Sequence, residues 1–436
     1  MNTPIADFLD AYAKKNGVRL HMPGHKGKNL SGVEKYDVTE IFGADQLFLP
    51  SGIIKESENN ASKIFGADTF YSAEGSTPIV KAMLYLAVKF KNSDATDTVI
   101  AFRNAHRSFT DATALIGFDI RWIYSEKQDV LSVSCALEKE NKPCAVYITS
   151  PDYFGNIADV KGISEICEKH GVPLIVDAAH GSYLKFLSPS IFPTDLGAAM
   201  CCSSAHKTLP ALTGAAYFHV GKTAKKEFSE NAKYALSLFS STSPSYLILR
   251  SLDKLNAVTA ENFKEKIANA VKKVKNLKDF LVKKGFKVAG DEPLKLTVLP
   301  LEYGYTGKEF ADIMRKSFIE CDYCEESSAI FMFSPYNKNS DMVRFKKAVS
   351  EIPKKPPVSV YSPDITPLKT VTTVQDAVLA PCEKVSVNNA CGRVLSHYNI
   401  TCPPAIPIAV PGEEIDGGTV ERFLYFGIKE IYVIKK

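Results

Sequence analysis

The segment SSAHKTLP, at residues 203–210, places two hydroxyls, a histidine and a lysine directly after the apolar run 198–202. A lysine at the end of a buried strand can form a Schiff base with a carbonyl compound, and nearby hydroxyls can bind a phosphate. A single lysine in a polar loop is nevertheless usually a solvated side chain. The interpretation of Lys207 therefore depends on what the other apolar runs lead into.

Two further apolar runs also lead into reactive side chains. The run 173–179 contains Asp177 and is followed by His180, and the run 97–103 is followed by His106. Short apolar runs separated by amphipathic stretches indicate the strands of a mostly parallel sheet. Ligands of such sheets bind beyond the carboxyl ends of the strands, so we expect these side chains at one site.

The residues before an expected helix at 77–91 form a candidate phosphate site. Gly75, Ser76 and Thr77 stand at its start, where free backbone N–H groups and the helix dipole favour an anion. Ordinary helix capping by Ser76 or Thr77 would select the same residue types. Ser204 supplies a further hydroxyl for a phosphate.

One cofactor, pyridoxal 5′-phosphate (PLP), accounts for all of these groups. Its aldehyde needs an amine, which Lys207 can supply, and its ring nitrogen stays protonated beside a buried carboxylate such as Asp177. His106 can stack on one face of the ring, the small residues 178–179 leave room on the other, and His180 can hydrogen-bond the ring hydroxyl.

The hydrophobic pattern predicts an α/β large domain and a smaller α+β C-terminal domain. The expected strands are 97–103, 145–151, 173–179, 198–204, 214–220, 295–301 and 329–335. The expected helices are 3–14 with Thr3 as a cap, 77–91, 160–171, and a long helix over 260–284 that Gly285 ends.

The length of 436 residues exceeds that of one ordinary core, so several domains are expected. We expect an N-terminal arm at 1–28, a cofactor-binding domain at 29–259, and a connecting helix with a C-terminal domain at 260–436. A Pro-rich break at 352–367 precedes a last module that begins at about residue 368.

Bulk composition excludes several classes of protein. The net charge of +4 is too mild, and the lysines too scattered, for a nucleic-acid-binding protein. Cys321 and Cys324 form one CxxC without a matching second pair, so we expect no metal site. The N-terminus lacks the pattern of a signal peptide, and no apolar run is long enough to span a membrane. We therefore expect a cytoplasmic protein with reduced cysteines.

Motifs over nearly the whole chain resemble the bacterial Orn/Lys/Arg decarboxylase family in its short form. This family belongs to the aspartate-aminotransferase-like PLP enzymes, called fold type I. The motifs are MPGHKGK (22–28), DVTEIFGADQLFLPSGIIKES (37–57), AEGST (73–77), RNAHRS (103–108), TSPDYFGN (149–156), VDAAHG (176–181), SSAHKTLPALTGAA (203–216) and PPAIPIAVPGEEI (403–415).

The resemblance implies a role for each candidate residue. Lys207 is then the Schiff-base lysine, Asp177 the partner of the ring nitrogen, and His106 the stacking residue. His180 lies near the ring hydroxyl. The residues around the phosphate are Ser76, Thr77, Ser204 and His206. The resemblance also implies a homodimer with active sites at the interface, which the segment around His25 approaches.

The implied reaction is the α-decarboxylation of arginine, lysine or ornithine to an amine of the polyamine pathway, with arginine favoured by the resemblance. The acidic residues that could hold the substrate side chain are Glu320, Asp322, Glu325 and Glu326. Glu74, Ala105 and Asp152 depart from the family pattern, which leaves the substrate open. A PLP-dependent aminotransferase, a β-eliminating lyase, or a non-enzymatic regulator on the same fold remain alternatives.

Overall fold

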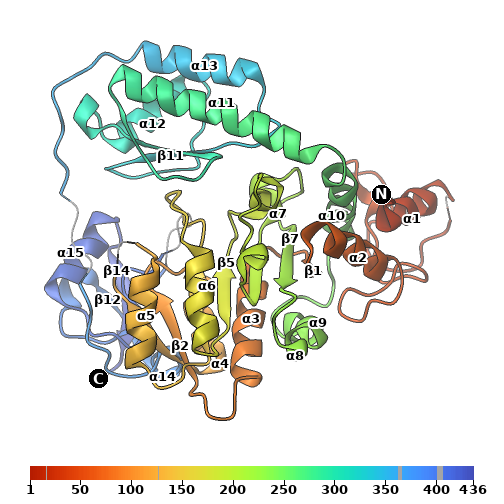
Figure 1. Cartoon of the computed structure of the whole chain (residues 1–436), viewed down its shortest axis with the longest axis horizontal. Helices are drawn as coiled ribbons and strands as arrows, with labels where there is room; N and C mark the ends of the chain where they lie inside the picture. Colours follow the sequence, from red (N-terminus) through yellow and green to blue (C-terminus); the bar gives the residue numbers. More distant parts are fainter. Residues whose placement is uncertain (16, 126, 362–365, 400–405) are drawn as a thin grey trace. The chain divides into compact units, whose positions relative to one another are not determined.

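The computed structural model describes residues 1–15, 17–125, 127–361, 366–399 and 406–436 (Figure 1). Parts of the expected Pro-rich break and of the motif 403–415 lie outside the described residues. The chain forms two compact units. The first contains residues 1–93, 159–270 and 334–336, and the second contains 94–158, 271–333 and 337–436. The domain boundaries expected from the sequence stay a prediction.

The large sheet has seven strands in the order β1-β7-β6-β5-β4-β2-β3. Their bounds are β1 Asp68–Ser72, β2 Thr98–Phe102, β3 Asp119–Ile123, β4 Ala145–Thr149, β5 Leu174–Asp177, β6 Met200–Ser203 and β7 Ala216–Val220. β2 runs parallel to β3 and β4, and β5 runs parallel to β6. β7 is antiparallel to both β6 and β1. The mostly parallel sheet expected from the sequence is therefore confirmed.

The central strands of the first unit are buried along their whole length. Every residue of β5, β6 and β7 is buried, as in sheets whose two faces are both covered. Two helices pack on this part of the sheet, α3 (Thr77–Lys89) on β6 and α6 (Val160–Lys169) on β5. The continuous apolar runs in the sequence follow directly from this burial.

Several further helices, of ten residues or fewer, lie between α3 and α10. They are α4 Arg107–Ile116, α5 Val130–Lys139, α7 Ala205–Thr208, α8 Lys226–Glu230 and α9 Ala232–Ser237. Three single 3-10 turns, η1 Glu34–Tyr36, η2 Ser182–Phe186 and η3 Pro193–Leu196, complete this region.

Two expectations about helix ends were wrong. The long helix expected from residue 260 begins only at Phe263, as α11 (Phe263–Lys284), because Asn262 has a φ of 46° and separates it from α10 (Tyr246–Thr259). Gly285, with a φ of 103°, ends α11 as expected. Thr3 does not cap α1 (Pro4–Lys14), since its hydroxyl bonds the Asp7 side chain instead of the helix backbone.

The second unit contains two antiparallel sheets. One has the order β10-β11-β9-β8 and is accompanied by two helices, and the other has the order β12-β14-β13. The bounds are β8 Lys287–Ala289, β9 Lys295–Leu299, β10 Tyr323–Cys324, β11 Ala329–Met332, α12 Gly307–Lys316 and α13 Asn339–Ser350. Those of the last part are α14 Val374–Leu379, β12 Cys382–Ser386, β13 Leu395–His397, α15 Gly417–Tyr425 and β14 Glu430–Ile434, with η4 Leu301–Tyr303 and η5 Val387–Asn389 between elements. The expected α+β character of this part is confirmed.

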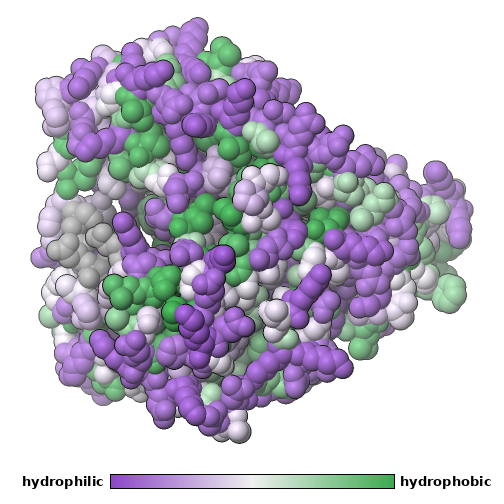
Figure 2. Space-filling view, viewed as in Figure 1, coloured by the Kyte–Doolittle hydropathy of each residue, from purple (hydrophilic) through white to green (hydrophobic). Residues whose placement is uncertain are grey.

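The segment between α1 and α2 (Ile53–Phe65) exposes an unusual number of apolar side chains. Phe42 and Leu20 are almost fully exposed, at 104% and 90%. The exposed apolar residues of this segment are Val18, Leu20, Met22, Leu30, Val33, Phe42 and Leu49. Figure 2 shows that hydrophilic residues otherwise cover much of the face drawn there. Large exposed apolar patches mark interaction sites, so this segment is a candidate for one.

A buried polar network joins α1, α2 and α10 in the first unit. Asp253 on α10 accepts hydrogen bonds from the backbone N–H of Ala6, at 2.9 Å, and from the Ser57 hydroxyl, at 2.5 Å. The Tyr71 hydroxyl lies 2.7 Å from the same Ser57 oxygen. Asp253 is fully buried, and burial raises the pKa of its carboxyl to about 6.

This raised pKa predicts a pH dependence of stability. Because the folded pKa exceeds the ordinary value of 3.8, the neutral carboxyl favours folding below pH 4, and this contribution is lost as the pH rises through 6. We expect the difference in free energy of unfolding between wild type and Asp253→Asn to fall by about 2 to 3 kcal/mol from pH 4 to pH 7. Chemical denaturation at several pH values measures it, and a difference independent of pH would contradict the assignment.

Candidate active site

Lys207 and His180 meet at the carboxyl ends of two neighbouring strands. Lys207 follows β6 within the short helix α7, and His180 follows β5. The parallel register pairs Asp177 with Cys202, so the loops after β5 and β6 leave the sheet side by side. Lys207 Nζ lies 2.9 Å from His180 Nε2. The predicted proximity of these two side chains is therefore observed.

Asp177 ends β5 and is buried, with 3% of its surface exposed. Its Oδ1 accepts a hydrogen bond from the Ala179 N–H, at 3.1 Å, and another from the Cys202 thiol, at 3.2 Å. Burial, followed by the charge of Asp177, raises the pKa of Cys202, which keeps this thiol protonated as a donor. Because Asp177 and Cys202 are partners in the parallel register of β5 and β6, this contact depends on strand pairing, which no local sequence pattern records.

The hydroxyls expected to bind phosphate do come together. Ser76 Oγ lies 2.7 Å from Ser204 Oγ, at the start of the 13-residue helix α3. Ser76 therefore does not cap α3 with its side chain, which corrects the alternative interpretation of Ser76 as an ordinary cap. Gly75 has a φ of 76°, and no atom lies within 4 Å of the position that a Cβ would take there. Thr77, the first helical residue, is exposed.

His206 belongs to the first unit and His106 to the second. His206 Nδ1 lies 3.0 Å from the Ala215 carbonyl oxygen, and burial lowers its pKa. His106 belongs to the second unit, where it caps α4 because its Nδ1 accepts a hydrogen bond from the Ser108 N–H at 3.1 Å. The stacking role of His106 stays a prediction.

The donor set of the first unit is chemically suited to PLP. It combines an amine on Lys207, a buried carboxylate on Asp177, and paired hydroxyls on Ser76 and Ser204 beside the open space at Gly75. A helix start with free N–H groups and hydroxyls favours a phosphate, and a buried carboxylate favours a protonated pyridine nitrogen. The residues present therefore fit this cofactor.

Two of the departures from the family pattern hold loops in place. Glu74 Oε1 accepts a hydrogen bond from the Ser241 N–H at 2.8 Å. Asp152 accepts hydrogen bonds from the backbone and the side chain of Asn156, at 2.9 and 2.7 Å. Both carboxylates therefore accept hydrogen bonds from backbone N–H groups and stabilise the conformation of their loops.

A buried lysine, which the sequence analysis did not single out, supports the loop after β4. Lys295 lies on β9 with only 1% of its side chain exposed and donates to the carbonyls of Asp152 and Tyr153, each at 3.1 Å. Its ion-pair partner Glu292, at 3.1 Å, is equally buried, and burial raises the pKa of this carboxyl. Its signal in the sequence is a charged residue at the start of the expected strand 295–301.

Breaking this pair should be strongly destabilising. Lys295→Met removes the charge that compensates Glu292 and leaves two carbonyls without their donor, so we expect a loss of about 3 to 5 kcal/mol in the free energy of unfolding. Adding Glu292→Gln should restore part of it. Chemical denaturation of both variants tests this, and a single variant as stable as wild type would refute it.

The four acidic candidates for the substrate side chain differ in their environment. Two of them form ion pairs, Glu326 with Lys308 at 2.7 Å and Glu320 with Arg315 at 3.4 Å. Asp322 accepts a hydrogen bond from the Tyr153 hydroxyl, at 2.5 Å. Glu325 accepts hydrogen bonds from Ser327 and Ser328, at 2.7 and 3.3 Å.

The two cysteines of the CxxC lie together in β10 and just before it. Burial, and after it the neighbouring Cys324 thiol, raise the pKa of Cys321 to about 11. Within the described part of the chain, no three His, Cys, Asp or Glu side chains gather as metal ligands. None of the described helices is long and apolar enough to cross a membrane.

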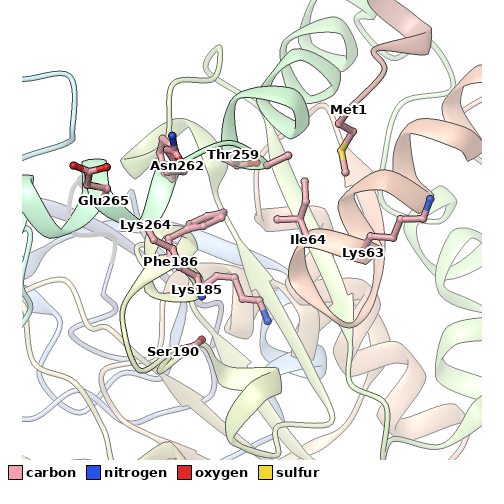
Figure 3. A pocket seen from close by; sticks show the side chains of 12 residues that line it. Met1, Lys63, Ile64, Lys185, Phe186, Ser190, Thr259, Asn262, Lys264 and Glu265 are labelled. Carbon is pink, nitrogen blue, oxygen red and sulfur yellow. The ribbon is translucent and has the colours of Figure 1, made fainter.

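A cavity of about 670 Å³ lies elsewhere in the first unit (Figure 3). Its walls come from the ends of α2 and α10, the start of α11, and the segment after His180. Lys185, in this wall, is already paired with Asp195 at 2.7 Å. None of the predicted site residues lines this cavity, so we assign it no part in the chemistry.

Two family models match this chain in sequence. Residues 3–300 match the major domain of Orn/Lys/Arg decarboxylases, and residues 358–431 match their C-terminal domain. The chain belongs to the Orn/Lys/Arg decarboxylase family. By its family, it is an enzyme, an amino-acid decarboxylase. The family expected from the sequence motifs is thereby confirmed.

Known proteins are similar to this chain in sequence or in fold. The arginine decarboxylase of Halalkalibacterium halodurans is 29% identical over 95% of this chain and 91% of its own. The constitutive lysine decarboxylase of E. coli has a similar fold, with a TM-score of 0.78 and 16% identity over 100% of this chain and 82% of its own. An alanine–glyoxylate aminotransferase from Nostoc sp. is more distant, with a TM-score of 0.56 and 16% identity over 68% and 85%. The aspartate-aminotransferase-like fold is confirmed.

Proposed function

We propose that this family member catalyses the PLP-dependent α-decarboxylation of a basic amino acid, releasing CO₂ and an amine of the polyamine pathway. The observation that carries the proposal is the contact of Lys207 Nζ with His180 Nε2, at 2.9 Å. It lies at the carboxyl ends of β5 and β6, where β5 also ends with the buried Asp177. These groups match what PLP chemistry requires. The family supplies the reaction type.

The residues that would hold the cofactor follow from the site. Lys207 would bind its aldehyde and Asp177 its ring nitrogen, while His180 and His106 would contact the ring. The phosphate would be bound by Gly75, Ser76, Thr77, Ser204 and His206. When bound, PLP supplies an electron sink for the bond that breaks at the α-carbon.

The protein side chains have three tasks in this reaction. Asp177 keeps a proton on the pyridine nitrogen, because the buried carboxylate favours the charged form of its partner. Lys207 and His180 share a hydrogen bond, so a proton can pass between Lys207 Nζ and His180 Nε2. We assign to this pair the return of a proton to the α-carbon after CO₂ leaves.

Arginine is the favoured substrate, with lysine and ornithine as alternatives. Two curated relatives that align with more than nine-tenths of this chain, from Halalkalibacterium halodurans and Bacillus subtilis, are named arginine decarboxylases. A guanidinium requires a carboxylate in a partly dry pocket. Asp322 and Glu325 are the better candidates, since Glu320 and Glu326 are already paired with cations.

We further propose a cytoplasmic homodimer whose active sites lie at the interface. The exposed apolar side chains of residues 18–49 support a contact with a second copy, because association would remove this apolar surface from water. His25, in the same segment, is held by Asp37 at 3.1 Å. Light scattering of the wild type and of Phe42→Ser measures the oligomeric state, and we expect the substitution to weaken the dimer.

A product assay tests the proposed reaction. The purified chain is loaded with PLP and offered arginine, lysine and ornithine separately, with CO₂ and amine detected by mass spectrometry. Release of the amine from one substrate identifies it. Keto acid or ammonia without CO₂ would instead establish an aminotransferase or a β-eliminating lyase and refute the decarboxylase.

A further inference from the structure

Arg103 is a buried charge that the proposed chemistry does not use. It follows the last residue of β2, and only 8% of its side chain is exposed. Its guanidinium donates to the carbonyls of Pro407 and Ile408, at 3.0 and 3.2 Å, and to Glu413 Oε2 at 3.3 Å. It also lies over the Trp122 ring, 5.2 Å from the centroid. All of these partners belong to the second unit.

The other half of this cluster lies in the C-terminal module, defined here as the described residues from 366 onward. Glu413 is 3% exposed, and its Oε2 also accepts a hydrogen bond from the Val410 N–H at 2.6 Å. Gly412 has a φ of 92°, and a Cβ there would lie 2.3 Å from the Thr372 carbonyl oxygen. The turn before Glu413 therefore requires glycine, which fixes the carboxylate in place.

The charge of Glu413 is needed where it lies. Burial, and after it the nearby charge of Arg103, lower the pKa of the Arg422 guanidinium, and Glu413 opposes this effect. A neutral side chain at position 413 would leave the buried Arg103 guanidinium without the carboxylate that lies 3.3 Å from it.

Arg103 is separated from His106 by only two residues. Ala105 is buried, and its N–H donates to the Phe102 carbonyl at 3.2 Å, so the link is a tight turn. His106 then starts α4 as its cap, at 3.1 Å from the Ser108 N–H. Displacing the guanidinium would therefore displace the start of α4.

The C-terminal module also contacts the far end of α4. Gln375, on α14, donates to the Ala114 carbonyl at 3.2 Å. Its side-chain oxygen lies 2.8 Å from where a Cβ of Gly117 would stand, and Gly117, with a φ of 85°, ends α4. The C-terminal module thus contacts α4 at both ends: through Arg103, just before the cap His106, and through Ala114, near its last residue.

We propose that Arg103 and Glu413 are positioning residues for His106, through which the C-terminal module sets the orientation of the ring that stacks on PLP. The proposal rests on the proposed function, since it takes His106 as the stacking residue. The proposal gives the motif at 403–415, which contains Glu413, an indirect task in the active site.

The test compares two neighbouring carboxylates in the full chain. Glu413→Gln removes the buried counter-charge and keeps the size of the side chain. Glu414→Gln is the matched control, because Glu414 pairs with the exposed Lys369 at 2.9 Å. We expect the dissociation constant for PLP, measured by absorbance titration, to rise about ten-fold or more in Glu413→Gln and less than about two-fold in Glu414→Gln.

A second background separates positioning from a general loss of structure. In a chain that carries His106→Ala, Glu413→Gln should weaken PLP binding by less than about two-fold, because the residue it positions is gone. Equal losses in the two backgrounds, or no loss in either, would overturn the proposal. If Glu413→Gln does not fold, Arg103→Lys replaces it in the same cycle.

Hydrogen exchange in the apoprotein gives a readout independent of activity. The amides of residues 103–110 should exchange faster in Glu413→Gln than in wild type, and unchanged protection there would also overturn the proposal. If the protein does not decarboxylate, but Glu413→Gln still weakens PLP binding only when His106 is present, the proposed reaction alone is refuted. A wild-type chain that does not bind PLP would overturn both.

Discussion

Replacing Lys207 by alanine is expected to lower the rate of decarboxylation by about a thousand-fold or more and to abolish the absorbance of the lysine-bound cofactor. Lys207 lies in α7 with its amine 2.9 Å from His180 Nε2, and alanine offers no group that could bind the aldehyde or move a proton. Turnover and the cofactor spectrum measure the effect directly.

Two controls make the Lys207 result specific. Lys226→Ala removes an exposed lysine that pairs with Glu230 on α8, and it should leave turnover unchanged. An added small primary amine should restore part of the turnover of Lys207→Ala, since it can replace the missing base. Full turnover in Lys207→Ala would rule out the proposed role of this lysine.

The second large effect is expected at Asp177. Asp177→Asn keeps the size of the side chain and removes the charge that favours a protonated ring nitrogen, so turnover should fall by about a hundred- to a thousand-fold. The variant should still bind PLP through Lys207 and the hydroxyls of Ser76 and Ser204. Kinetics and a pH titration of the bound cofactor's spectrum distinguish loss of the charge from loss of the cofactor.

The conservative variant completes this test. Asp177→Glu keeps the charge and should retain more turnover than Asp177→Asn, although its longer side chain disturbs the hydrogen bonds from Ala179 and Cys202. A merely structural role would show the reverse order, since asparagine matches the size of the native side chain better. That order would contradict the assignment of Asp177 to the ring nitrogen.

Much of the fold was predictable because buried parallel strands must be apolar along their length. The apolar runs that end at Asp177 and before Lys207 satisfy this rule, and they correspond to β5 and β6. The edge strand β3 carries no continuous apolar run, since Ile123 is its only buried residue. The antiparallel direction of β7 could not be predicted either, because no local pattern records the direction in which a strand enters a sheet.

The sequence alone determined the family, the α/β class, and the reactive groups at the ends of β5 and β6, because strand ends and helix starts are local features. The tertiary structure decided which groups meet across long separations. It paired Ser76 with Ser204, Cys202 with Asp177, and Arg103 with Glu413, which lies 310 residues further along the chain. Such partners depend on strand order and register, which arise only when distant segments pack together.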